Sequence, residues 1–155
     1  MKKIGLVIAM AFMVSITFGQ KVNFSGEWKL NAEKSELGAQ FSIAPDNIVV
    51  KHTRKTIEVE KHGQMQGQEY TTNDLFTLDG KACENPGIGN SVKKSTAVWN
   101  KKTKVLTIAS VIPLDDGSDV ELIEELAMEE DNLVIGTSAA SAYGEMFEKY
   151  VFDKE

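Results

Sequence analysis

Apolar and polar residues alternate along much of the chain, and the period is clearest over residues 22–30. The apolar phase there consists of Val22, Phe24, Trp28 and Leu30, with Gly26 in the remaining place. Successive side chains of a β-strand point to opposite faces, so this period of two predicts a strand with one buried and one exposed face.

Eight further segments have the same period or are apolar runs bounded by turn residues, which predicts strands. They are residues 47–53, 56–61, 70–78, 92–99, 104–112, 120–128, 133–138 and 145–153. Asp79-Gly80 and Asp115-Asp116-Gly117 predict turns, because Asp-Gly tolerates the positive φ that tight hairpin turns require. Residues 83–90 contain one proline and two glycines and are expected to form an ordered loop. Residues 31–40 lose the period, which predicts a turn with at most a short helical piece.

Sequential strands with short connections predict an antiparallel meander. An open sheet of this size leaves two unpaired edges that favour aggregation, and closure into a barrel removes them. The predicted fold class is therefore all-β, an antiparallel up-and-down β-barrel of about 8–10 strands. A β-sandwich is the alternative, and it is less favoured because sandwiches need long crossing connections. A barrel of this size holds either its own side chains or one small ligand.

The start of the chain differs from the rest. Met1-Lys2-Lys3 is positively charged, residues 4–18 are almost wholly apolar, and small residues, Thr17 and Gly19, precede Gln20. This order is typical of a cleavable signal peptide. The apolar stretch is shorter than the roughly 20 residues that span a bilayer core, which argues against a stable membrane anchor. No cysteine near the cut could carry a lipid.

We therefore expect a signal peptide over residues 1–19, a barrel domain over residues 20–155, and a periplasmic or secreted protein. The 155 residues suffice for one domain. Seventeen Lys and Arg against 23 Asp and Glu give a net charge of −6, which lacks the basic footprint of a nucleic-acid-binding protein. The single cysteine, Cys83, cannot form an internal disulfide, and with two histidines it cannot complete a four-ligand zinc site. No metal and no cofactor is predicted.

The first and last predicted strands resemble those of a known superfamily. Phe24-Ser25-Gly26-Glu27-Trp28-Lys29-Leu30 is similar to the opening strand of the calycins, which comprise lipocalins and fatty-acid-binding proteins, and most of all to that of the fatty-acid-binding proteins. Val151-Phe152-Asp153-Lys154 resembles their last strand. The chain is also similar to secreted bacterial lipocalin-like proteins of uncharacterised function. That likeness is carried by Trp28-Lys29-Leu30-Asn31, Lys34-Ser35, Leu78-Asp79-Gly80-Lys81 and Trp99.

The resemblance implies structural roles for three residues. Trp28, with Gly26 before it, would pack across one end of a closed barrel. Lipocalins place an arginine of the last strand over this tryptophan, and the candidate here is Lys149, whose stem could cover the ring. The Arg-x-Tyr motif with which fatty-acid-binding proteins hold a carboxylate reads Tyr150-Val151-Phe152 here, so that site is not carried over.

Four polar residues share the apolar phase of predicted strands and are candidate ligand contacts: Glu124, His52, Tyr70 and Asp74. A carboxylate inside an apolar barrel is costly unless it is paired, neutralised or hydrated. Glu124 is therefore either a ligand handle or a residue turned to water by a bulge or by a position at the rim. No nucleophile, base and orienting group can be assembled, so no catalytic residue is predicted and the chain is not expected to be an enzyme.

Two functions are compatible with these observations. The first is an exported lipocalin-like protein that binds a small apolar molecule inside the barrel, driven by burial of apolar surface. The alternative is a protein-interaction or inhibitor module with a filled barrel and no ligand. In that case the acidic face formed by Glu121, Glu125 and Glu129, or the loop over residues 83–90, would contact a protein partner.

Overall fold

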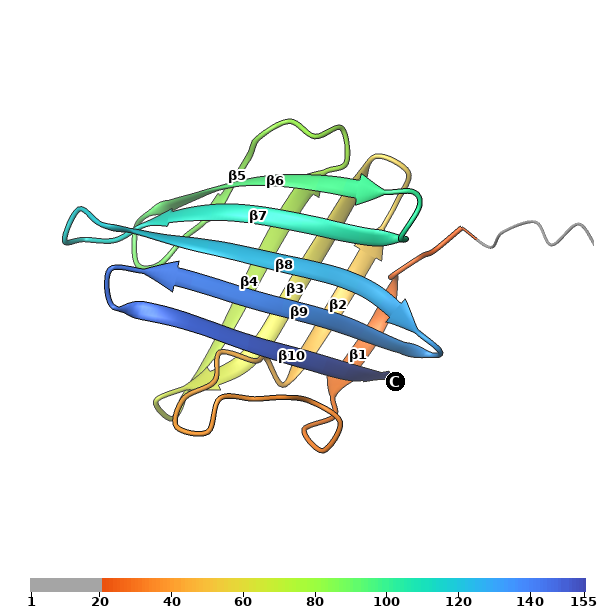
Figure 1. The fold of residues 1–155 in the computed structure, drawn as a ribbon, viewed down its shortest axis with the longest axis horizontal. Helices are drawn as coiled ribbons and strands as arrows, with labels where there is room; N and C mark the ends of the chain where they lie inside the picture. The colour runs from red at the N-terminus through yellow and green to blue at the C-terminus, as the bar shows by residue number, and fades with distance from the viewer. Residues whose placement is uncertain (1–20) are drawn as a thin grey trace, which may run out of the picture.

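A computed structural model describes residues 21–155, which form ten β-strands and no helix (Figure 1). The strands are β1 (Gly26–Leu30), β2 (Asn47–His52), β3 (Thr56–Met65), β4 (Gln68–Thr77), β5 (Cys83–Pro86), β6 (Val92–Asn100), β7 (Val105–Pro113), β8 (Asp119–Glu129), β9 (Asn132–Ser141) and β10 (Gly144–Lys154). The all-β prediction is confirmed. The predicted signal peptide lies outside the described residues. Among residues 21–155 no helix is long and apolar enough to cross a membrane.

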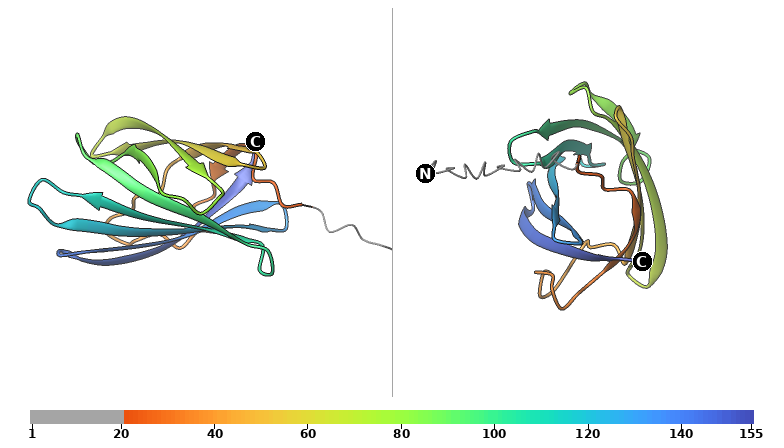
Figure 2. Two further views of the ribbon diagram at one scale, coloured as in Figure 1. Left: turned by 90° about the horizontal axis from the view of Figure 1, so that it is seen from above. Right: turned by 90° about the vertical axis from the view of Figure 1, so that its right-hand side faces the viewer.

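The strands form one antiparallel sheet in the order β4-β3-β2-β1-β10-β9-β8-β7-β6-β5. Each strand pairs with its neighbours in sequence, except that β4 and β5 are the two edges of the sheet and do not pair. In addition β1 pairs with β10, where Trp28 lies opposite Lys154. This pairing joins the two ends of the meander, and the sheet curls into a nearly closed barrel (Figure 2). The structure therefore confirms the up-and-down barrel and not the sandwich.

The seam of the barrel, between β4 and β5, is bridged by a side chain instead of a backbone ladder. The Asn85 Nδ2 donates a hydrogen bond to the Leu75 carbonyl oxygen at 3.1 Å, and its Oδ1 accepts one from the Leu75 N–H at 2.8 Å. The two bonds imitate one rung of an antiparallel ladder. Asn85 is buried, so its amide group has to be hydrogen-bonded within the protein. The same two bonds satisfy the backbone N–H and carbonyl of Leu75 at the edge of β4.

Two local predictions need correction. The loop expected over residues 83–90 is wrong in its first half, because Cys83–Pro86 form β5 along β6. Pro86 is compatible with this strand because β5 lies at the edge of the sheet. The alternation predicts that the first strand begins at Val22, but β1 begins at Gly26. The φ of Gly26 is +150°, a backbone conformation that other residues rarely adopt, and it interrupts the extended chain at this point.

Trp28 is almost fully buried, and its indole Nε1 donates to the Phe24 carbonyl oxygen at 2.9 Å. This bond passes close to Gly26, where a Cβ would come within 3.4 Å of the same nitrogen. The expectation that Lys149 covers Trp28 is wrong: the Nζ of Lys154 lies 5.7 Å from the ring centroid. The side-chain period explains this, because residue 154 lies opposite Trp28 in the ladder whereas residue 149 has the other phase. Lys149 instead points outward.

Candidate functional site

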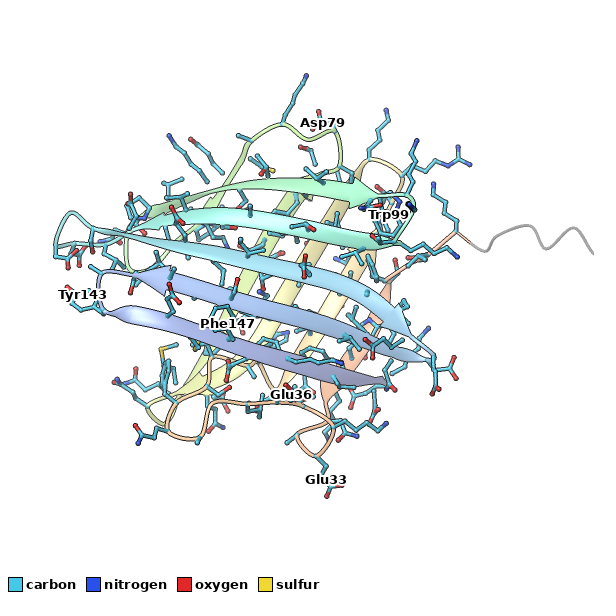
Figure 3. All side chains as sticks on the ribbon, viewed as in Figure 1. Glu33, Glu36, Asp79, Trp99, Tyr143 and Phe147 are labelled. Atoms are coloured by element: carbon cyan, nitrogen blue, oxygen red, sulfur yellow. The ribbon has the colours of Figure 1, made fainter. Side chains whose placement is uncertain are left out.

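A cavity of about 450 Å³ opens at the end of the barrel where the β2–β3, β4–β5 and β6–β7 connections meet. We call it the mouth. Figure 3 labels two residues of its lining, Asp79 in the β4–β5 connection and Trp99 near the end of β6. The apolar part of the lining consists mainly of Val22, Leu78, Ala97 and Trp99. The polar part includes His52 and three cations, Lys21, Arg54 and Lys101.

Aromatic packing holds His52 in place below the mouth. The imidazole stacks on Phe24 with 5.4 Å between ring centroids, and Trp99 meets Phe24 edge-on at 6.0 Å. The Phe24 N–H donates to the His52 Nδ1 at 3.3 Å, so a neutral ring carries its proton on Nε2. Burial, together with the charge of Lys21, lowers the pKa of His52. At neutral pH the mouth is therefore lined by an uncharged imidazole that can donate a hydrogen bond.

The mouth has an excess of positive charge. None of Lys21, Arg54 and Lys101 forms an ion pair with another residue of the described chain. Asp79 is the carboxylate in the lining, and it accepts hydrogen bonds from the Lys81 N–H at 3.0 Å and the Thr77 hydroxyl at 2.9 Å. A concave surface with unbalanced cations attracts anions, although the chain as a whole is acidic.

Glu124 lies inside the barrel, and neither a bulge nor the rim turns it to water. It is 5% exposed, and the Lys61 Nζ donates to its Oε1 at 2.5 Å. Burial disfavours ionisation of Glu124, but the charges of Lys61 and Lys93 outweigh burial and lower its pKa. The carboxylate is therefore ionised and paired within the protein.

Asp74 takes part in a second interior ion pair, in which the Lys93 Nζ donates to its Oδ2 at 2.6 Å. Both side chains are buried. This pair joins β4 to β6, and the Lys61–Glu124 pair joins β3 to β8. Neither couple of strands is adjacent in the sheet, so the two pairs cross-link walls that no backbone ladder connects. We call these four residues the ion-pair layer.

Tyr70 is also away from the mouth. Its ring covers Gly63 on β3, where a Cβ would come within 2.8 Å of the ring. It lines a separate shallow hollow at the opposite end of the barrel, beside the β3–β4 turn. Of the four candidate ligand contacts, the structure therefore places only His52 in the mouth.

The opposite end of the barrel is covered by the connection between β1 and β2 (residues 31–46). The Glu148 carboxylate holds this segment, because it accepts hydrogen bonds from the Gly38 N–H at 2.7 Å and the Ile43 N–H at 3.3 Å. The Tyr150 hydroxyl donates to the same carboxylate at 2.6 Å. The mouth is thus the open end, and the segment over residues 31–46 caps the other.

The sequence analysis missed Arg54, Lys101, Leu78 and Trp99 as parts of one site. A signal was available, because alternate connections of an up-and-down barrel lie at the same end. The connections over residues 53–55, 78–82 and 101–104 each contain basic residues. Within residues 21–155 no group of three or more His, Cys, Asp or Glu side chains is placed to hold a metal ion.

No protein family model matches the chain, and no curated protein is significantly similar to it. Among solved structures, the chain is similar to zebrafish ileal bile acid-binding protein complexed with cholic acid, with a TM-score of 0.58. The match covers 85% of this chain and 98% of that chain at 13% sequence identity. At this identity the similarity concerns the fold alone, and it shows that the ten strands form an up-and-down barrel like that of the bile acid-binding protein.

Proposed function

We propose that the chain is an exported binding protein for a small apolar molecule with an acidic group, which it holds at the mouth of the barrel. The observation that carries the proposal is the cavity of about 450 Å³, in which an aromatic and aliphatic wall meets three unpaired cations. The cholic acid in the similar solved structure is an acid on a largely apolar skeleton, which supports this class of ligand. The pattern of residues 1–19 supports export to the periplasm or the medium.

The apolar part of the ligand would pack against Leu78, Ala97 and Trp99, gaining roughly 25 cal/mol for each Å² removed from water. The acidic group would lie near Arg54 and Lys101. Because both side chains are exposed, each contributes about 1 kcal/mol or less, and mainly discriminates between charged and neutral ligands. The ion-pair layer lies deeper and its charges are balanced, so it is not part of this binding site.

Two bile acid derivatives test the proposal. Cholate and its uncharged methyl ester are titrated into the mature protein, and binding is followed by the fluorescence of Trp99, with Trp99→Phe as the control for the signal from Trp28. We expect both compounds to bind and cholate to bind about tenfold more tightly. The double variant Arg54→Gln/Lys101→Gln should bring the two affinities together. Lys51→Gln, an exposed lysine elsewhere on the barrel, should preserve the difference.

Failure to bind either compound would overturn the proposed function at the mouth. A cholate preference that survives in Arg54→Gln/Lys101→Gln would place the acidic group elsewhere. Export is tested separately by the intact mass of the protein from its own host, which should lack residues 1–19. The full-length mass would contradict that part.

A further inference from the structure

Gly136 lies in the middle of β9, and the fold gives no reason for a glycine at this position. Its φ is not positive, and a Cβ added to it would meet no other heavy atom within 4 Å. A glycine within a strand costs roughly 0.5–1 kcal/mol relative to alanine. Such a glycine often marks a place where another molecule approaches the backbone closely.

The space above Gly136 belongs to a hollow of about 370 Å³ on the outer wall of the barrel, which we call the β9 hollow. Ile123, Ser138 and Phe147 form one cross-strand row over β8, β9 and β10 and line one side of it. Phe147 is 74% exposed and Ile123 is 43% exposed. Figure 3 shows Phe147 on the outer surface of this wall. The hollow therefore exposes two large apolar side chains that the fold itself does not bury.

The remaining sides of the β9 hollow are mainly acidic. In the ladder Gly136 lies between Glu125 of β8 and Lys149 of β10, and the backbone of Glu36 pairs with that of Lys149 on the far side. Lys149 is paired with Glu129 at 3.6 Å. Glu36 and Glu125 take part in no ion pair with any residue between 21 and 155. The row that contains Gly136 thus runs beside the exposed apolar row and has an unpaired carboxylate at each end, Glu125 and Glu36.

We infer that the β9 hollow is a docking site for a basic segment of a partner protein. The segment would place an apolar side chain over Gly136, against Phe147 and Ile123, and its Lys or Arg side chains near Glu36 and Glu125. Charge complementarity selects this occupant, because unpaired carboxylates at both ends of the row beside the apolar side chains attract a segment that combines cationic and apolar residues, and the one cation of that row, Lys149, is already paired with Glu129. The contact leaves the mouth free, so docking and ligand binding are separate properties of the barrel.

Gly136→Val is the decisive variant. The new side chain fills the hollow without a clash, and valine suits a strand better than glycine does, so the fold should be kept or stabilised. The probe is a fluorescein-labelled peptide of alternating lysine and leucine, followed by anisotropy. We expect Gly136→Val to weaken binding at least about tenfold while the midpoint of urea unfolding stays the same or rises.

Controls separate docking from general adhesion. Phe147→Ser should weaken binding in the same way, whereas Leu75→Ser, an exposed leucine on β4, should leave it unchanged. A peptide of alternating glutamate and leucine should not bind. Equal binding of the basic peptide to the wild type and to Gly136→Val, or no binding to the wild type, would overturn the inference. Sedimentation that shows a dimer lost in Gly136→Val would also overturn it, because the occupant would then be a second copy of the chain.

Discussion

The ion-pair layer and the mouth both place charged side chains on an apolar barrel, but they differ in charge balance. In the layer, Lys61 meets Glu124 at 2.5 Å and Lys93 meets Asp74 at 2.6 Å, with every side chain largely buried. At the mouth, Arg54 and the neighbouring lysines are exposed and have no carboxylate partner in the described chain. The first region is neutral and buried, whereas the second is positive and exposed.

This difference separates structural charges from charges that can recognise a ligand. A buried charge must be paired because the interior screens it weakly, and once it is paired it has little attraction left for a ligand. An exposed cation contributes little to the stability of the fold, and because no carboxylate neutralises it, it can attract an incoming anion. When a charged residue shares the inward-facing phase of a strand, the first expectation should therefore be an oppositely charged side chain elsewhere in the barrel, and only then a ligand.

The largest expected effect comes from breaking one interior pair. Lys61→Met leaves Glu124 buried without its cation, and we expect the free energy of unfolding to fall by about 3–5 kcal/mol. Lys61→Met/Glu124→Leu removes both charges and should recover most of that loss. Urea unfolding at neutral pH measures both. A single variant that loses less than about 1 kcal/mol would show that the pair is not structural.

The strands could be predicted because their signal is local. Val22 to Leu30 and the later segments carry a period of two, and closure into a barrel follows from the unpaired edges that an open meander would have. The strand β5 was missed because its evidence is not local. Asn85 faces β4, and its amide is explained only by the Leu75 backbone across the seam.

The candidate site was harder to predict for the same reason. Glu124 and Lys61 are 63 residues apart, and their meeting depends on strand order and on the width of the barrel. The predicted strand over residues 56–61 ended at Lys61, although β3 continues to Met65, so that lysine did not stand out as an interior residue. The register of β10 likewise decides that Lys154, and not Lys149, covers Trp28.

Glu148 sharpens the comparison, because it is a buried carboxylate that forms no ion pair with any cation of residues 21–155. Burial alone would raise its pKa, but hydrogen bonds from the Gly38 N–H and the Tyr150 hydroxyl outweigh burial, and the pKa of Glu148 is lowered. The ionised form therefore stabilises the fold above the ordinary value of 4.5, and this stabilisation is lost as the pH falls through the lowered pKa.

The variant Glu148→Gln should lower the free energy of unfolding by about 2 kcal/mol at neutral pH, since a charge-assisted acceptor is removed from the cap over residues 31–46. The gap between wild type and variant should close under acid conditions. Urea unfolding across an acid pH series measures both, with the exposed Glu145→Gln as the control. A gap that stays constant at all pH values would contradict the role of the ionised carboxylate.

A smaller effect is expected for the cation over Trp28. Lys154 is exposed, and its ammonium lies 5.7 Å from the ring centroid, so Lys154→Met should cost about 0.5 kcal/mol. Lys29→Met serves as the matched control, because Lys29 is an exposed lysine on the other face of β1 and takes part in no ion pair within the described chain. Thermal unfolding and the emission spectrum of Trp28, recorded in a Trp99→Phe background, should respond to the first change only.

The smallest effect on stability is expected at the mouth. Its small size is informative, because it would separate the role of Arg54 in ligand binding from any role in folding. Arg54→Gln should change the free energy of unfolding by less than about 0.5 kcal/mol, because the guanidinium is exposed and has no ionic partner to lose. The same change should weaken cholate binding, whereas Lys61→Met should destabilise the fold and leave the cholate affinity of the folded protein unchanged. Urea unfolding and cholate titration of both variants complete the test. If Arg54→Gln lost stability and kept cholate affinity, the arginine at the mouth would be structural, and unbalanced charge would no longer distinguish the two regions.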